Sequence, residues 1–216
     1  SDHADVRRAR GAAAALAACG VASQHESVAS GAAEASIREA PEAASHYTAK
    51  AAVTAQRFIV AAAHPLATDA GYRILAAGGS AVDAAIAVQM VLTLVEPQSS
   101  GIGGGLFLMH HDGKQVHAID GRETAPAAAT PDLFMQGNQE MTLMQSVVGG
   151  RAVGTPGVLR ALALAHRLHG KLAWRALFEP AIQLAEQGFA ISPRLATLLR
   201  EGMAQPMRRD SNAAAY

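Results

Sequence analysis

The sequence GIGGGLFLMHHDGKQVHAIDGR, residues 101–122, contains the clearest structural signal in the chain. Two β-prone runs, Leu106–His111 and Lys114–Asp120, flank the dipeptide Asp112-Gly113. Asp-Gly between such runs favours a hairpin turn of type I′, in which both central residues need a positive φ. We therefore predict an antiparallel β-hairpin that follows a glycine-rich turn and ends just before Arg122.

Helical signals precede the hairpin. A short β-prone run, Phe58-Ile59-Val60, is expected to open the ordered part of the chain. A first helix is expected from Pro65 to Ala77, because proline suits the first turn and two glycines follow the last one. Ser80 and Asp83 have the spacing of a capping box for a second helix that runs to Val95. This second helix is apolar nearly all round, so we expect it to be buried on most sides.

Further helices are expected after the hairpin. One begins at Gly154-Thr155-Pro156-Gly157 and ends near His169, and the next runs from Trp174 to Gln187 before Gly188. Ser192-Pro193 begins another. This order lacks the regular alternation of strands and helices that parallel sheets require. It predicts a mixed α/β (α+β) fold in which helices pack on an antiparallel sheet.

The composition excludes several classes of function. Lys plus Arg and Asp plus Glu both total 18, and no basic face alternates with aromatic residues, so we expect no nucleic-acid binding. The single cysteine, Cys19, excludes an intrachain disulfide and a Cys-rich zinc site. Hydrophobic residues make up 50% of the chain but aromatic residues only 4%, which favours a helix-rich, closely packed interior.

The first 20 residues have the pattern of an export signal or a lipoprotein leader. Three arginines between positions 7 and 10 precede an apolar run, and Leu16-Ala17-Ala18-Cys19-Gly20 resembles a lipobox, in which the cysteine becomes lipidated. An Ala-rich disordered leader is the alternative interpretation. Residues 21–56 are rich in Ala and Ser and read as a linker. We therefore expect a periplasmic or secreted protein, with membrane anchoring through Cys19 if it is lipidated.

The glycines and histidines give no sign of a cofactor or a metal. Leu106 stands where a dinucleotide-binding fingerprint needs its third glycine, and a strand follows in place of a helix. Two interpretations of the glycine-rich turn remain, a close backbone approach and a simple tight turn. His110 and His111 should point to opposite faces of a strand, while His166 and His169 share a helix face without a nearby acidic residue. We predict no catalytic residue, metal site or organic cofactor from these patterns.

Arg122 is the candidate binding residue. A guanidinium at the end of a strand can make a planar, two-point contact with a carboxylate, which lysine cannot reproduce. The alternative is a surface salt bridge with Glu123 or Asp120, worth at most about 1 kcal/mol. Local spacing alone favours the salt bridge.

The chain resembles the large subunit of the γ-glutamyltranspeptidases over about three quarters of its length. The matching blocks occur in the order that the family has. They are His64-Pro65-Leu66-Ala67, Gly78–Ala85, Pro97-Gln98, Gly103–Leu108, Arg122-Glu123-Thr124-Ala125-Pro126, Gly154–Gly157, His169-Gly170, Gln183-Leu184-Ala185, Gly188-Phe189 and Arg209–Ala214. So many blocks in one order make a chance match very improbable.

The resemblance implies an N-terminal-nucleophile hydrolase, an αββα sandwich that is made as a precursor and cuts itself into a large and a small subunit. Residues 57–216 would then be part of the large-subunit domain. A Thr at the start of the small subunit attacks the γ-amide of glutathione or a related compound, and the γ-glutamyl ester is passed to water or to an amino acid or peptide. Of the family's substrate contacts, only the arginine that binds the glutamyl α-carboxylate maps onto this chain, as Arg122.

No segment resembling the processing site and its Thr occurs before Tyr216. We therefore expect an incomplete sandwich that, on its own, neither processes itself nor turns over a γ-glutamyl substrate. Two other hypotheses stay open. The first is a cephalosporin or glutaryl acylase, because these amidases share the architecture and much of the sequence. The second is a non-catalytic remnant that acts as a binding module.

Overall fold

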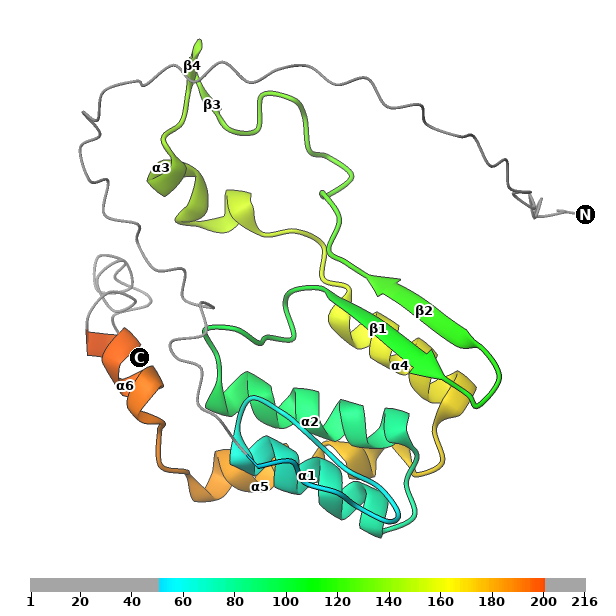
Figure 1. Ribbon diagram of the computed structural model, residues 1–216. Helices are drawn as coiled ribbons and strands as arrows, with labels where there is room; N and C mark the ends of the chain where they lie inside the picture. Colours follow the sequence, from blue (N-terminus) through cyan, green and yellow to red (C-terminus); the bar gives the residue numbers. More distant parts are fainter. Residues whose placement is uncertain (1–50, 201–216) are drawn as a thin grey trace, which may run out of the picture. The chain divides into compact units, whose positions relative to one another are not determined.

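The computed structural model of the protein describes residues 51–200 (Figure 1). The predicted leader, Cys19, most of the predicted linker and the block Arg209–Ala214 lie outside the described residues. The helices and strands are α1 (Pro65–Ala76), α2 (Ala81–Val95), β1 (Leu106–His111), β2 (Val116–Gly121), β3 (Met135–Gln136), β4 (Gln139–Glu140), α3 (Leu143–Val147), η1 (Gly150–Ala152), α4 (Val158–His169), η2 (Trp174–Leu177), α5 (Glu179–Gln187) and α6 (Pro193–Leu198). Within this part of the chain, no helix has both the length and the apolar character needed to span a membrane.

The first two helices form where the sequence predicts them. The Nδ1 atom of His64 accepts a hydrogen bond from the Leu66 N–H at the start of α1. At its end, Gly78 takes a φ of 89° and Gly79 donates to the carbonyl of Ile74, which completes a Schellman cap. Ser80 and Asp83 make the predicted capping box of α2. Helix α2 is buried along most of its length and packs against α1, α4 and α5, as its all-round apolar sequence predicts.

The run Phe58-Ile59-Val60 does not form a strand, so that expectation was wrong. No strand in the described part of the chain lies alongside it, and its side chains pack on α1 instead. The Phe58 ring lies 5.4 Å from the ring of Tyr72, and a Val60 methyl group lies over Gly71. A β-prone composition alone does not form a strand without a partner to complete the hydrogen-bond ladder.

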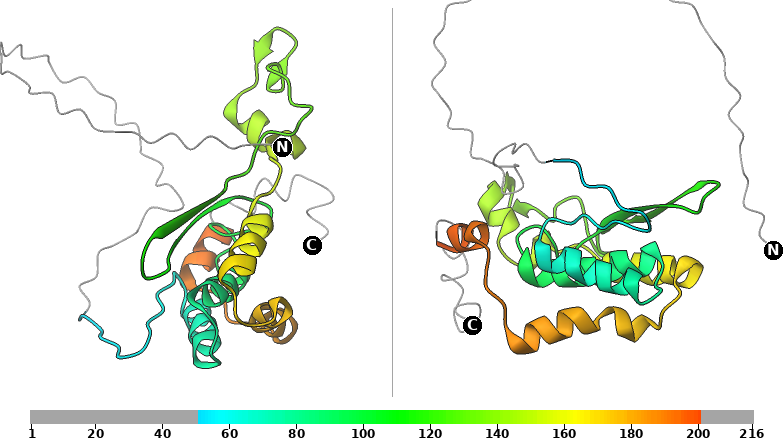
Figure 2. Two further views of the ribbon diagram at one scale, coloured as in Figure 1. Left: turned by 90° about the vertical axis from the view of Figure 1, so that its right-hand side faces the viewer. Right: turned by 60° about the horizontal axis from the view of Figure 1, so that its bottom comes forward.

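The predicted hairpin is present as β1 and β2, paired antiparallel from Leu106↔Gly121 to His111↔Val116. One face carries Leu106, Leu108 and Ile119, which pack into the main core with α2 and α4. The hairpin lies against α4 on this side (Figures 1 and 2). The other face leaves Phe107 and Met109 exposed (71% and 75%). A mixed α/β arrangement of helices on an antiparallel hairpin is therefore what the described residues form.

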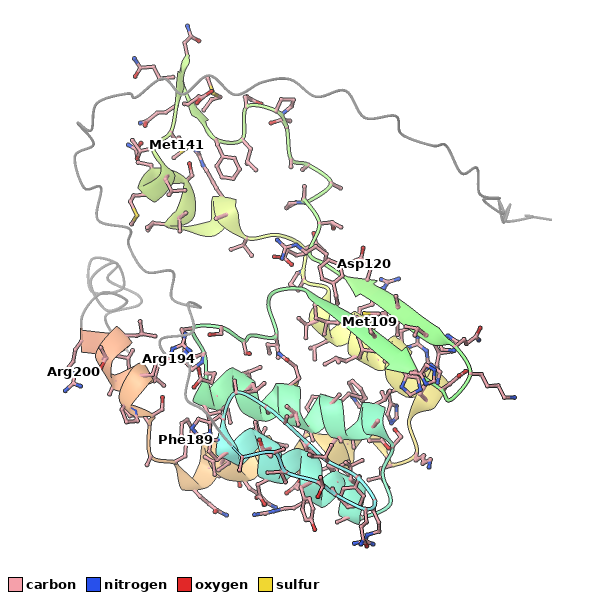
Figure 3. The ribbon with its side chains drawn as sticks, viewed as in Figure 1. Met109, Asp120, Met141, Phe189, Arg194 and Arg200 are labelled. Carbon is pink, nitrogen blue, oxygen red and sulfur yellow. The ribbon has the colours of Figure 1, made fainter. Side chains whose placement is uncertain are left out.

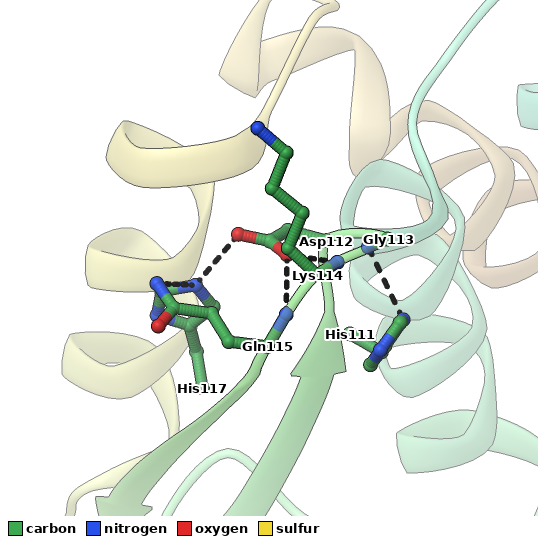
Figure 4. Close-up of polar contacts among 6 residues, drawn as sticks. All are labelled: His111, Asp112, Gly113, Lys114, Gln115 and His117. Carbon is green, nitrogen blue, oxygen red and sulfur yellow. Dashed lines mark hydrogen bonds and ion pairs between the residues drawn. The ribbon is translucent and has the colours of Figure 1, made fainter.

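The hairpin turn is not the predicted type I′ turn. Only Gly113 has a positive φ (97°), because the Asp112 side chain stabilises a different turn (Figure 4). Its Oδ1 accepts hydrogen bonds from the N–H groups of Lys114 and Gln115 at 2.8 and 2.9 Å. The Gln115 N–H, the His117 side chain and the Lys114 N–H together hold the pKa of the Asp112 carboxyl well below its usual range. The side chain thus replaces a backbone acceptor, as Asp does in many turns.

The helix predicted from Trp174 to Gln187 is divided into η2 and α5 at Phe178. Pro180 lies in the first turn of α5, where it has no N–H to continue a hydrogen-bond ladder from the preceding residues. The break has a function in packing. It lets Leu177 point into the main core, where it is fully buried beside Trp174 and Phe178.

Residues 130–153 add elements that the sequence analysis did not predict. Strands β3 and β4 form a two-residue-long hairpin around Gly137, and Thr142 and Gln145 form a capping box on α3. None of the residues in α3 or η1 is buried. Figure 3 shows Met141 in this segment, apart from α1, α2 and α5. The segment therefore contributes little to the core.

Candidate substrate-binding site

Arg122 directly follows Gly121, the last residue of β2. Its backbone N–H donates to Oδ1 of Asp120 at 2.9 Å. Its side chain is 65% exposed, and its Nη1 atom lies 3.5 Å from Oε1 of Glu123. The structure therefore places the guanidinium at the end of the strand, as the sequence predicts.

The two salt-bridge alternatives have different outcomes. Glu123 does approach the guanidinium, but at a distance longer than a good charge-assisted hydrogen bond. Asp120 binds the backbone of Arg122, and the described residues include no ion pair between their side chains. An exposed, long ion pair of this kind contributes little to stability. The guanidinium can therefore exchange it for the carboxylate of a ligand at small cost.

Glycine at three positions lets the backbone segments around Arg122 approach one another closely. A Cβ atom on Gly157 would lie 2.1 Å from the Gly121 carbonyl oxygen, and a Cβ on Gly121 would lie 2.4 Å from the Cβ of Ala161. A Cβ on Gly105 would lie 2.8 Å from the Cα of Arg122. All these distances are too short for real side chains. The close-approach interpretation of the glycine-rich turn therefore holds for Gly105.

Backbone hydrogen bonds also join the segments around Arg122 to the start of α4 and to Thr155. The N–H groups of Gly157 and Val158, at the start of α4, donate to the Gly104 carbonyl at 3.0 and 3.3 Å. Thr124 and Thr155 exchange two backbone hydrogen bonds of 3.3 and 2.8 Å in an isolated antiparallel bridge. The residues on both sides of Arg122 are thus attached to the glycine-rich turn and to the segment before α4.

Glu123 occupies the space between these segments. Its side chain packs against Gly154, and its Oε2 atom would clash with any side chain on Gly105. That oxygen is buried and has no hydrogen-bond partner among the described residues. Packing therefore holds the Oε2 side of the Glu123 carboxylate, while Oε1 lies 3.5 Å from Nη1 of Arg122.

Arg122 lines a pocket of about 400 Å³ between β2 and α4. Arg160 and Arg167 of α4 also line it, whereas Asp120 is its only acidic residue. A larger pocket, of about 740 Å³, lies between β3 and α3 and is lined mainly by Met135, Met141, Met144 and Val148. It has a single arginine, Arg151, against three in the Arg122 pocket, so the Arg122 pocket is the better candidate for binding a carboxylate despite its smaller size.

Three histidines that appear separate in the sequence meet at the other end of the hairpin. His110 and His117 face each other across the strands, and the ring of His169, the last residue of α4, lies 4.1 and 5.2 Å from theirs. Burial, followed by the nearby His169 and His117, lowers the pKa of His110. Among residues 51–200, no group of three His, Cys, Asp or Glu side chains is arranged to hold a metal ion. The strand register would have predicted the His110–His117 pair, but the approach of His169 from α4 depends on tertiary packing.

Comparison with known proteins identifies the family. The sequence model of the gamma-glutamyltranspeptidase family matches residues 67–216. The chain belongs to the γ-glutamyltranspeptidase family. It is 45% identical over 146 residues to the glutathione hydrolase proenzyme of Bacillus subtilis (strain 168), in an alignment that covers 66% of this chain and 25% of that protein. It is also 38% identical over 183 residues to the acylase ACY 1 proenzyme of Pseudomonas sp. (strain V22), which covers 81% of this chain and 32% of that protein.

Solved structures of the family share the fold. The γ-glutamyltranspeptidase of Helicobacter pylori superposes with a TM-score of 0.72 and 33% identity, over 77% of this chain and 48% of that one. The described helices and hairpin therefore form part of the γ-glutamyltranspeptidase fold. The chain spans about a quarter of the length of the Bacillus subtilis protein and about half of the solved chain.

Proposed function

We propose that this chain forms part of a γ-glutamyltranspeptidase that cleaves the γ-glutamyl amide of glutathione and related compounds. Arg122 is the residue that supports the proposal most directly. It lies in the Arg-Glu-x-Ala-Pro block of the family, and its guanidinium is exposed at a strand end. The backbone around it is held by close glycine contacts and by the Thr124–Thr155 bridge. We assign it the binding of the glutamyl α-carboxylate.

In the complete precursor, the nucleophile would be the Thr at the start of the small subunit. Its hydroxyl oxygen would form a bond to the γ-carbonyl carbon while its proton passes to the α-amine of the same Thr. The amide C–N bond then breaks, and the leaving amine takes up a proton. The resulting γ-glutamyl ester would be attacked by water or by the amine of an acceptor, which regenerates the Thr.

Arg122 would act on binding and orientation. The α-carboxylate carries the same charge in the substrate and in the transition state, so a contact with it stabilises both. Such a contact lowers KM and aligns the γ-carbonyl with the nucleophile. It supplies no proton and forms no bond.

Kinetics of an Arg122→Ala variant of the complete precursor test this assignment. We expect the loss of the charge contact to cost about 2 to 5 kcal/mol in kcat/KM for a γ-glutamyl anilide, chiefly as a higher KM. Arg122→Lys should recover only part of the loss, because lysine cannot make the two-point contact. Arg175→Ala removes the same charge outside the pocket and serves as the control. A normal KM in Arg122→Ala would remove Arg122 from the site.

The acylase similarity supports a second candidate, cleavage of cephalosporin or glutaryl amides. The acylase alignment covers more of this chain than the glutathione hydrolase alignment, although at lower identity. A glutaryl anilide keeps the carboxylate of a γ-glutamyl anilide at the same position and lacks only the α-amine. Turnover of the first and not the second by the complete precursor would support the transpeptidase, and the reverse result would support the acylase.

We further propose that the small subunit of the same precursor covers the exposed face of the β1–β2 hairpin. Phe107 and Met109 are highly exposed there, as is Val116 on the adjacent strand. A contiguous apolar strand face of this kind favours packing against a second layer. Protection of these side chains from oxidative labelling in the processed enzyme would support this proposal, and equal labelling of the isolated chain and the complete enzyme would refute it.

Export to the periplasm or the medium is also a proposal, and it rests on sequence alone. The basic residues before an apolar run and the lipobox-like Leu16–Gly20 support it. Mass spectrometry of the native N-terminus tests it. A mature protein that begins at a lipidated Cys19 would establish the anchor, and an uncleaved leader would refute export by this route.

A further inference from the structure

We propose that Asp120 is a positioning residue for Arg122, and this proposal rests on the function proposed for Arg122. The hydrogen bond from the Arg122 N–H to Oδ1 of Asp120 is 2.9 Å long and joins residues only two apart. It forms where the strand pairing ends, because the last pair of the ladder is Leu106↔Gly121. The Asp120 carboxylate therefore takes the place of the next backbone acceptor.

This bond determines where the arginine side chain leaves the strand. Gly121 is held by its pairing with Leu106 and by its contact with Ala161. Thr124 is held by its bridge to Thr155. Between these two fixed points, the Arg122 N–H has the Asp120 side chain as its partner. Figure 3 shows Asp120 at this end of β2.

The described residues contain no ion pair between Asp120 and the guanidinium. Asp120 lines the same pocket as Arg122, so a carboxylate that turned toward the guanidinium would compete with an anionic ligand. The hydrogen bond to the Arg122 N–H holds Oδ1 on the backbone and so disfavours this competition. The effect on binding is indirect, because loss of this hydrogen bond would shift the guanidinium and weaken its contact with the ligand carboxylate.

The hairpin provides a matched control at its other end. Asp112 uses the same chemistry there, because its Oδ1 accepts the N–H groups of Lys114 and Gln115. Replacing Asp112 by Ala removes side-chain-to-backbone bonds from the same hairpin without touching the Arg122 pocket. It therefore reports any general effect of a weaker hairpin on activity.

Three substitutions in the complete precursor separate the hydrogen bond from the charge. Asp120→Ala removes both, Asp120→Asn keeps an acceptor at the same distance without the charge, and Asp120→Glu keeps the charge but moves the acceptor by one methylene group. We expect Asp120→Ala and Asp120→Glu to raise KM for a γ-glutamyl anilide roughly three- to tenfold with little change in kcat. Asp120→Asn and Asp112→Ala should stay within about twofold of wild type. Processing and the thermal midpoint of the Asn and Glu variants would verify that both fold.

A double-mutant cycle with Arg122→Ala tests whether Asp120 acts through Arg122. If it does, Asp120→Ala raises KM in the wild-type background and has no further effect in the Arg122→Ala background. An equal fold-increase in KM from Asp120→Ala in both backgrounds would refute the positioning role. So would a KM for Asp120→Asn that is raised as much as that for Asp120→Ala. An unchanged KM for Asp120→Ala beside a raised KM for Arg122→Ala would refute this role alone, whereas a normal KM for Arg122→Ala would refute the proposed function itself.

Discussion

At the scale of single residues, Asp83 connects parts of the chain that are far apart in sequence. Its side chain is fully buried, and Oδ2 accepts hydrogen bonds from the N–H groups of Ser80, Lys171 and Leu172. The capping box could be predicted from the sequence, because it needs only residues three apart. The contacts with the segment after α4 could not, because they depend on the tertiary packing of α2 and α4.

We predict that Asp83→Ala destabilises the complete precursor by about 3 kcal/mol, because it leaves three partly buried N–H groups without their acceptor. Urea denaturation would measure the change in the free energy of unfolding. Asp69→Ala removes an exposed carboxylate that pairs with Arg73 on α1, and it should change this free energy by less than about 1 kcal/mol. Equal effects of the two substitutions would contradict the assignment of a structural role to Asp83.

The lowered pKa of the Asp83 carboxyl makes the stability of the fold depend on pH in the acid range. Burial alone would raise the pKa of its carboxyl, but the hydrogen bonds from Ser80, Lys171 and Leu172 outweigh burial and lower it below the ordinary value. The unfolded chain therefore binds the proton at higher pH than the folded chain does. The stabilisation is present above the unfolded pKa of about 4 and is lost as the pH falls through the folded pKa.

The histidine cluster predicts a second pH dependence in a separate range. Because the pKa of His110 is lowered in the folded protein, the unfolded chain binds more protons below the ordinary histidine pKa of 6.5. Stability should therefore fall as the pH decreases from about 6.5 toward the folded pKa of His110. His110→Gln should reduce this slope in thermal unfolding, while His111→Gln should reduce it much less, because His111 is the smallest of the contributions that lower the pKa of His110. An unchanged slope in His110→Gln would contradict the prediction.

At the scale of elements, the arrangement around Arg122 depends on how closely α4 approaches the hairpin. We predict that Gly157→Ala destabilises the fold by about 1 to 3 kcal/mol, because the added Cβ would overlap the Gly121 carbonyl. It should also raise KM by displacing Arg122. Gly103→Ala in the same glycine-rich turn has open space and should be nearly neutral. Equal effects of both substitutions on unfolding would show that the close approach does not matter.

The elements that the sequence predicts well are those with local end signals. Ser80, Gly78 and Ser192 mark helix ends through hydrogen bonds within a few residues, and these ends are found as predicted. The run at residues 58–60 fails as a strand because no partner strand lies beside it. The break at Phe178 follows from the way Leu177 and Trp174 fill the core, which the helical period of the sequence does not reveal.

At the scale of the whole molecule, the order of the family blocks predicted the family and its fold, which the local spacing of residues could not. The fold class could be predicted from the sequence, and the role of Arg122 stays a proposal that the resemblance of its block to the family suggests. Spacing alone favoured a salt bridge, and the structure contains one with Glu123 at 3.5 Å, whereas Asp120 binds the backbone. The glycine contacts and the Thr124–Thr155 bridge could not be predicted from the sequence, because they depend on the tertiary structure.

Binding of the α-carboxylate of a γ-glutamyl donor by Arg122 can be tested with two anilide substrates, one with that carboxylate and one without it. The kcat/KM of wild type and Arg122→Ala precursors would be compared for γ-glutamyl anilide and for 4-aminobutyryl anilide, which lacks only that carboxylate. We predict that loss of the carboxylate lowers kcat/KM on the order of 30-fold or more in wild type and less than about threefold in Arg122→Ala. The same loss in both proteins would contradict the claim.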